Sequence, residues 1–190
     1  MLQNSIVMKR IVTIATLALL MGILPMTAQA QTWGAPDYMK GKLVTGGQIG
    51  AGFSGNTLHL GIAPQLGFRP IRSLEFGIRL GYDLDYHFRS YYNPYSVCYH
   101  YFSGAVYANY EIFRGIYVHA EDEELCCLVR GHADWFNTVF TGVGYRHYYN
   151  TSYVYYAFLL NLSWIFDDYG YATSPYASPY VVRMGYCWTL

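Results

Sequence analysis

Apolar and polar positions alternate most regularly between Leu58 and Tyr86. Every second residue of two successive runs is apolar: Leu58, Leu60, Ile62, Pro64, Leu66 and Phe68, then Leu74, Phe76, Ile78, Leu80, Tyr82, Leu84 and Tyr86. Side chains point alternately to the two faces of a β-strand, so this period of two predicts a pair of strands. The short stretch 69–73 between them predicts a turn, and the whole segment is therefore a predicted β-hairpin.

The opposite face of this hairpin carries small and charged residues. It consists of His59, Gly61, Ala63, Gln65 and Gly67 in the first strand and Glu75, Gly77, Arg79, Gly81, Asp83 and Asp85 in the second. A soluble barrel would turn its bulky apolar face inward and leave this glycine-rich strip in water. A narrow transmembrane barrel does the reverse, because its lumen admits small residues and paired charges while lipid covers the apolar face. The pattern therefore predicts two strands of a transmembrane β-barrel.

Weaker alternation over the rest of the chain predicts six more strands, at about 42–53, 97–112, 116–121, 135–146, 153–164 and 180–190. Eight strands make the smallest common outer-membrane barrel. We therefore expect an all-β fold, an eight-stranded antiparallel up-and-down transmembrane β-barrel over residues 42–190. Longer loops are expected at 87–96, 122–134 and 167–179, as in barrels whose long loops face the outside. Residues 31–41 are expected to form a loose N-terminal lead.

Residues 1–30 have the pattern of an export signal. Lys9 and Arg10 precede an apolar run over 11–24, which is followed by Pro25 and the small residues Ala28 and Ala30. This order predicts a secretory signal peptide that is removed after Ala30. The alternative is a single transmembrane anchor, but the run is shorter than the ~18 apolar residues that an anchor needs. We therefore expect export and, given the barrel, location in the cell outer membrane.

Charge and aromatic content fit this picture. Removal of Lys9 and Arg10 leaves 10 basic residues against 12 acidic ones, a formal charge of −2. This balance gives no indication of a nucleic-acid partner. The 22 tyrosines suit strands, and their amphipathic rings suit the membrane–water interface, so they predict aromatic girdles around the barrel.

Four cysteines, Cys98, Cys126, Cys127 and Cys187, remain after the signal segment. In an oxidising compartment they allow more than one set of disulfides, and no C-x-x-C pair indicates a metal site. Cys98 and the adjacent pair are expected near the same end of the barrel. A disulfide of Cys98 with Cys126 or Cys127 is therefore one alternative, and unpaired thiols packed in the structure are the other.

Ionisable residues on the inward face are the main candidate site. They are Glu75, Arg79, Asp83, Asp85, Glu111, His119, Glu121, Arg146 and Arg183. Eight strands enclose a lumen just wide enough for side chains to fill it, and an unpaired buried charge costs several kcal/mol. We therefore predict a structural salt-bridge network that fills the lumen, rather than a channel.

Metal binding has only weak support in the sequence. His119 and Glu121 share one strand face, but a specific site needs three or four ligands, so a hydrogen-bonded pair is the simpler interpretation. The acidic runs 122–124 and 167–168 suit either weak calcium binding or solvated loops. We predict no metal site and no cofactor.

Several segments together form a recognisable set of motifs. They are 60–68 (LGIAPQLGF) with 73–77 (SLEFG), 119–121 (HAE), 142–146 (GVGYR) and the closing 178–186 (SPYVVRMGY). In these motifs the chain resembles the small outer-membrane β-barrel proteins of Bacteroidetes-type bacteria. The resemblance implies fold and location and names no substrate or reaction. It also implies that the barrel-assembly machinery recognises the last strand, although Leu190 stands where phenylalanine is usual.

Three function classes are compatible with these features. We expect a non-enzymatic integral outer-membrane protein, in contact with membrane lipid, with a structural or scaffold role. The first alternative is a surface binding or adhesion module that contacts an extracellular ligand through loops 87–96, 122–134 and 167–179. The second is a lipid-modifying enzyme, which would need a Ser/His/acid set. No spacing ties any serine among Ser90, Ser96, Ser103 and Ser152 to any histidine among His87, His100, His132 and His147.

Overall fold

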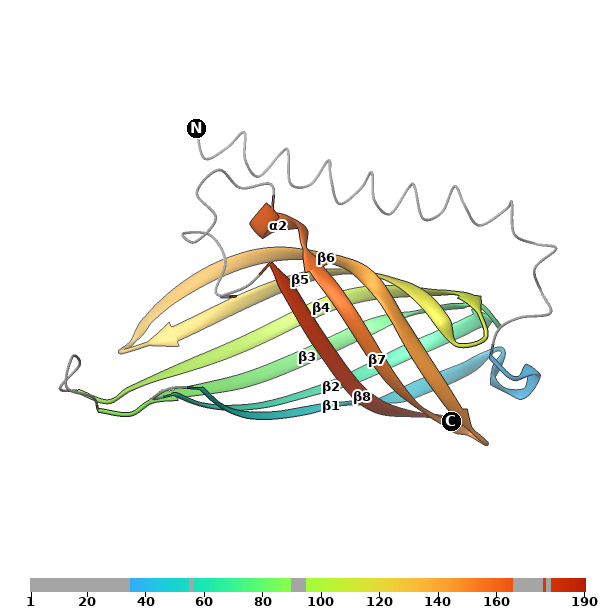
Figure 1. The fold of residues 1–190 in the computed structure, drawn as a ribbon, viewed down its shortest axis with the longest axis horizontal. Coiled ribbons are helices and arrows are strands. Elements are labelled where there is room, and N and C mark those ends of the chain that lie inside the picture. Colours follow the sequence, from blue (N-terminus) through green and yellow to red (C-terminus); the bar gives the residue numbers. More distant parts are fainter. Residues whose placement is uncertain (1–34, 55–56, 90–94, 166–175, 177–178) are drawn as a thin grey trace.

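The chain folds into one closed barrel (Figure 1). The computed structural model describes residues 35–54, 57–89, 95–165, 176 and 179–190, so the predicted signal segment lies outside the described residues. The strands are β1 (Lys42–Ser54), β2 (Thr57–Ile71), β3 (Leu74–His87), β4 (Val97–Phe113), β5 (Ile116–Val129), β6 (His132–Tyr149), β7 (Ser152–Asn161) and β8 (Tyr180–Thr189). Each strand pairs antiparallel with its neighbours in chain order, and β8 closes on β1. The predicted all-β, eight-stranded, up-and-down barrel is confirmed.

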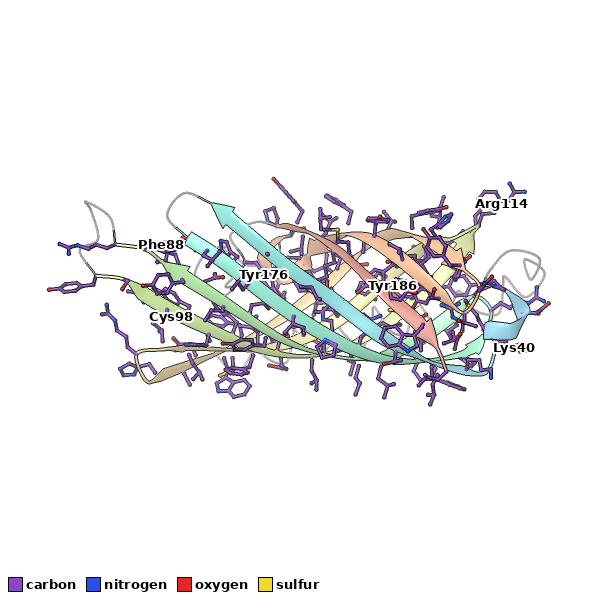
Figure 2. The ribbon with its side chains drawn as sticks, turned by 90° about the horizontal axis from the view of Figure 1, so that it is seen from below. Lys40, Phe88, Cys98, Arg114, Tyr176 and Tyr186 are labelled. Atoms are coloured by element: carbon purple, nitrogen blue, oxygen red, sulfur yellow. The ribbon has the colours of Figure 1, made fainter. Side chains whose placement is uncertain are left out.

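The two ends of the barrel differ in their connections. One end, here called the terminal end, holds the start of β1, the end of β8 and the turns at 72–73, 114–115 and 150–151. The other, the distal end, holds the end of β1, the starts of β2 and β4, the end of β3 and the turn at 130–131. Lys40 and Arg114 lie at the terminal end, and Phe88 and Cys98 lie at the distal end (Figure 2). The described residues also form the short helices η2 (Asp37–Met39) and α2 (Leu162–Ile165), and α2 replaces the last part of the strand predicted over 153–164. No helix in the described ranges has the length and apolar content needed to span a bilayer.

The prediction of a long loop at 122–134 is wrong. Strands β5 and β6 remain paired up to Val129 opposite His132, and only Arg130 and Gly131 form the turn. Both turn residues have positive φ, 48° and 84°, which is the backbone that two-residue hairpins require. The acidic run suggested a loop because charges occupy both faces of β5 here. On the outer face, Asn137 of β6 satisfies two of them by donating to Asp122 and Glu124, at 2.9 and 3.0 Å.

The N-terminal lead, predicted to be loose, is packed against the terminal end over the described residues 35–41. Met39 and Ala35 are buried, and the Arg69 guanidinium lies 3.6 Å from the Met39 sulfur. The Ala35 amide donates to the Arg72 carbonyl, and Arg72 forms an ion pair with Asp37. This segment therefore covers the terminal mouth of the barrel.

Burial alternates along the strands in the sense opposite to that of a soluble barrel. The apolar side chain of Ile78 is 50% exposed, whereas the neighbouring Arg79 is 5% exposed. The same inversion recurs in β6 and β8, where Val143 and Val182 are exposed and Arg146 and Arg183 are buried. The barrel thus presents an apolar outer wall and encloses its charges.

Glycines of the inner face make room for tyrosines in the lumen. A Cβ atom at Gly185 would lie 2.6 Å from the Tyr155 hydroxyl, and one at Gly67 would lie 2.6 Å from the Tyr107 hydroxyl. The Tyr117 ring lies against Gly144 in the same way. The inner-face glycines and several of the tyrosines therefore pack against each other: the missing glycine side chains leave the space that the tyrosine rings occupy. The sequence pattern assigned the tyrosines to girdles and missed those in the lumen.

Substitution of Gly144 by alanine tests this packing. The added methyl group would overlap the Tyr117 ring and the Tyr156 carbonyl, so we expect the free energy of unfolding to fall by about 1–3 kcal/mol. The matched control is Gly104→Ala on the outer wall, where the nearest atom to a Cβ is 4.0 Å away. Urea titration of the barrel in detergent, followed by tryptophan fluorescence, measures both changes. Equal stability of the two variants would contradict the packing described.

Candidate functional site

The terminal half of the lumen holds a cluster centred on Glu75, which is completely buried. Its carboxylate accepts a hydrogen bond from Arg69 at 2.5 Å and lies 3.1 Å from an Arg146 nitrogen. The Tyr153 hydroxyl lies 3.0 and 2.9 Å from the two carboxylate oxygens, and Asn109 donates at 3.4 Å. We call this set the terminal cluster. Arg69 and Glu75 come from the adjacent strands β2 and β3, whereas Arg146 comes from β6, so the cluster joins distant strands of the barrel.

A second set of charges, the central cluster, lies further along the lumen. Arg79 donates to both oxygens of Glu121, at 2.8 and 2.6 Å, and Arg183 donates to the same carboxylate at 2.6 Å. Glu123 lies 3.0 Å from Arg79 and 3.6 Å from Arg183. Two arginines therefore face two glutamates, and their formal charges cancel. Such bidentate pairs are geometrically demanding, which fits a rigid lumen.

Aromatic rings cover Arg69 and Arg146 in the terminal cluster and Arg183 in the central cluster. The Arg146 guanidinium lies 4.5 Å from the centre of the Tyr117 ring, and that of Arg183 lies 4.7 Å from the Phe140 ring. Cations at this distance from a ring face are attracted by its quadrupole, more strongly where water is excluded. The rings thus supply both packing and charge compensation.

Tyr176, from the segment between α2 and β8, reaches the central cluster and donates to Glu123 at 2.5 Å. Burial and the neighbouring Glu123 carboxylate raise the pKa of the Tyr176 hydroxyl well above its usual value. The hydroxyl therefore stays protonated and acts as a donor at any physiological pH.

The structure brings most of the predicted lumen residues together. Glu75 and Arg146 lie in the terminal cluster, and Arg79, His119, Glu121 and Arg183 lie in the central one. The three others lie elsewhere in the lumen. Glu111 accepts from the Gly115 amide at the terminal rim, Asp85 pairs with His59 at 2.6 Å, and Asp83 lines a cavity at the distal side.

Two members of the clusters were missed by the sequence pattern. Arg69 was placed in a turn and Glu123 in a loop, but both lie on the inner face of strands that extend further than predicted. Continuing the strict alternation beyond Phe68 and beyond Glu121 would have placed both side chains inward.

The prediction of a filled lumen holds for the terminal half and the centre but not for the distal part. Between the two clusters there is a small space of about 20 Å³, roughly enough for one water. On the distal side of Arg79 and Arg183 there is a cavity of about 580 Å³, bounded by Asp83, Asp85 and Tyr101 among others. The lumen is therefore closed at one end and hollow at the other.

Metal ligation finds no geometric support within the described ranges, where no three His, Cys, Asp or Glu side chains converge. The His119 ring bonds Asn109 at 2.6 Å and Glu121 at 3.2 Å, so both nitrogens are engaged. The acidic run at 122–124 splits between the two faces of β5, since Glu123 points inward and its two neighbours bond Asn137 on the outer wall. The run 167–168 lies outside the described residues.

All four cysteines lie in described strands, and all four are free thiols. The bridge considered for Cys98 with Cys126 or Cys127 is not formed. The register places Cys127 opposite Tyr101 and Cys126 opposite Phe102, so Cys98 lies further toward the distal end of β4. Cys187 is in the lumen instead, where Gln65 donates to its sulfur at 2.9 Å.

Two of the histidines considered for a lipid-modifying site bond to residues other than serine. His87 pairs with the Thr57 hydroxyl and His100 with the Tyr82 hydroxyl, each at 3.0 Å. Ser103 lines the distal cavity, and Ser90 lies outside the described residues. The geometry therefore adds no support for a Ser/His/acid set.

Comparison of the chain with protein-family models finds no match, and comparison with curated proteins finds none either.

Proposed function

We propose that this chain is an integral outer-membrane β-barrel with a structural or scaffold role and no continuous channel. The observation that carries the proposal is the inverted burial: large apolar side chains cover the outer wall, and paired charges occupy the terminal and central parts of the lumen. Exposing so continuous an apolar wall to water would be costly, whereas lipid accepts it. We also propose that the predicted export signal directs the chain out of the cytoplasm and that the barrel-assembly machinery recognises its last strand. The proposed relatives are the small outer-membrane barrels of Bacteroidetes-type bacteria.

Gel mobility provides a simple test. A folded transmembrane barrel resists unfolding by detergent until it is boiled. We therefore expect the unboiled and boiled samples to migrate to different positions on the gel. We also expect the protein to require detergent for solubility. A soluble barrel would instead remain in solution without detergent and show one mobility, and that result would overturn the proposal.

The closed terminal half predicts that the barrel does not conduct ions. Residues 35–41, which include the buried Met39, cover the mouth at the terminal end, and the two clusters occupy the lumen behind them. In planar bilayers at neutral pH we expect no discrete conductance steps above the bare membrane. Stepwise currents that scale with protein concentration would show an open path and would contradict this arrangement.

Surface binding is the second candidate, and the projecting β5–β6 hairpin is the feature that favours it. Trp135 near its tip is 72% exposed, and exposed tryptophans are frequent anchors at interfaces. Of the three loops first considered, 122–134 is this hairpin; residues 90–94 of the loop 87–96, and all of the loop 167–179 except 176 and 179, lie outside the described residues. Trp135→Ala should abolish capture of an extracellular ligand if the hairpin is the contact surface, and binding that survives it would exclude Trp135 as the anchor.

A further inference from the structure

The barrel closes through a very short seam between β1 and β8. Their register covers only Val44–Gly47 of β1, opposite Tyr186–Thr189 of β8. Among the described residues, β1 beyond Gly47 pairs with β2 alone, and β8 from Gly185 back to Tyr180 pairs only with β7. The two strands meet near the labelled C-terminus and diverge toward the distal end (Figure 1). The facing edges, Gln48–Ala51 of β1 and Val182–Gly185 of β8, therefore form no ladder with each other.

The residues that a longer seam would pair line the distal cavity instead. Continuing the register would place Ile49 opposite Met184 and Ala51 opposite Val182, and all four residues border the cavity. These side chains belong to the outer wall, and Ile49 is 79% exposed. A Cβ atom at Gly50 between them would meet nothing within 4 Å. The cavity thus opens sideways through the wall, and we call this opening the β1–β8 portal.

The portal lies within the part of the wall that crosses the membrane. β8 has 10 residues, close to the ~9–11 that span the hydrocarbon core, and its outward aromatic residues Tyr180 and Trp188 stand near its ends. Unpaired strand edges are not tolerated in direct contact with lipid, although irregular backbone does occur where it lines a cavity. The polar cavity behind the portal provides such a lining, and the apolar side chains of Ile49, Val182 and Met184 at its outer side provide a surface for an alkyl chain.

The cavity behind the portal is polar and has an excess of acid. Arg79 and Arg183 form its floor, but Glu121 and Glu123 already compensate their charges. Asp85 pairs with His59. Asp83 is exposed on the cavity wall, and no hydrogen bond or ion pair engages it among the described residues. A head group that brings a positive charge is therefore the electrostatic complement of this cavity.

We propose that the β1–β8 portal and the distal cavity bind an amphiphile from the surrounding leaflet. Its single alkyl chain lies in the portal between β1 and β8, and its cationic amine head lies beside Asp83 and Asp85. The cavity of about 580 Å³ is within the usual size of small-molecule sites. This inference rests on the proposed membrane location, since only a barrel in lipid meets such a ligand through its wall.

Photolabelling tests the site directly. The probe is dodecylamine with a diazirine in its chain, added to the barrel in phosphatidylcholine vesicles, and only protein that shows the heat-dependent mobility shift is counted. If the membrane proposal is wrong, the protein shows no heat-dependent shift. If only the portal proposal is wrong, the protein shows the shift but is not labelled at the portal. We expect the label on peptides containing Ile49–Ala51 and Val182–Met184, and we expect excess unmodified dodecylamine to remove it.

Three comparisons define the outcome. Gly50→Trp places a large ring in the open portal and should reduce labelling at least tenfold, whereas Gly104→Trp on the outer wall of β4 should leave it unchanged. Asp83→Asn, which preserves the shape of the cavity, should reduce labelling about tenfold, the usual effect of losing one charge-assisted hydrogen bond. The matched dodecanoate probe should label at least tenfold less. Label spread evenly over the apolar wall, or equal labelling by amine and carboxylate probes, would overturn the proposal.

Discussion

Replacement of Glu75 by glutamine is expected to lower the free energy of unfolding by about 3–5 kcal/mol. The carboxylate is completely buried and is the counter-ion of both Arg69 and Arg146. The amide keeps the shape of the side chain but removes its charge, so two guanidinium groups remain buried without compensation. Urea titration of the folded barrel, reconstituted in vesicles, measures the change.

The matched control for Glu75 is Glu124→Gln. Glu124 has the same side chain on the exposed outer face of β5, where it only accepts a hydrogen bond from Asn137. Exposed charges contribute little to stability, so we expect a change below about 0.5 kcal/mol. If the two glutamine variants lost similar stability, the terminal cluster would not be the electrostatic core described above.

The central cluster is expected to show strong coupling between Glu121 and Arg183. Glu121→Gln and Arg183→Met should each cost about 3–5 kcal/mol, because each leaves a buried partner charge. The double variant retains Arg79 with Glu123, which compensate each other at 3.0 Å. Its cost should therefore be smaller than the sum of the single costs by about 1–3 kcal/mol.

A double-mutant cycle by urea titration measures this coupling. His147→Ala combined with Glu121→Gln gives the uncoupled reference, since His147 packs against Tyr149, and Tyr149 is exposed. Additive costs for Glu121 and Arg183 would mean that the two residues do not act as a pair in the folded lumen.

The barrel could be predicted from sequence because its signal is local. In β2, β3 and β8, apolar residues alternate with small or charged ones at a period of two. This pattern alone predicts each strand and shows which of its residues share a face. The signal weakens where both faces carry charge, as at Asp122 and Glu123. There the polar outer face of the strand resembles the composition of a loop, and the two-residue turn at Arg130 has no asparagine–glycine signature.

The partners inside the lumen were harder to predict, because they depend on register between strands that are distant in sequence. Glu75 meets Arg146 only through the shear of the closed barrel. Alternation places both side chains in the lumen but does not determine their positions along the barrel axis. The β1–β8 seam is subject to the same limit. No residue in Gln48–Ala51 marks the end of pairing, so the distal cavity and its portal emerge only from the closed structure.

The central claim is that the apolar wall faces lipid, and nitroxide accessibility at two positions on the neighbouring strands β2 and β3 tests it most directly. Spin labels at Ile78 on the outer wall and at Ala63 on the cavity side are compared after reconstitution, with the native cysteines replaced by alanine. We predict that the label at 78 collides readily with oxygen and scarcely with a water-soluble nickel chelate, and that the label at 63 favours the chelate. Free access of the nickel chelate to position 78 would contradict the transmembrane account.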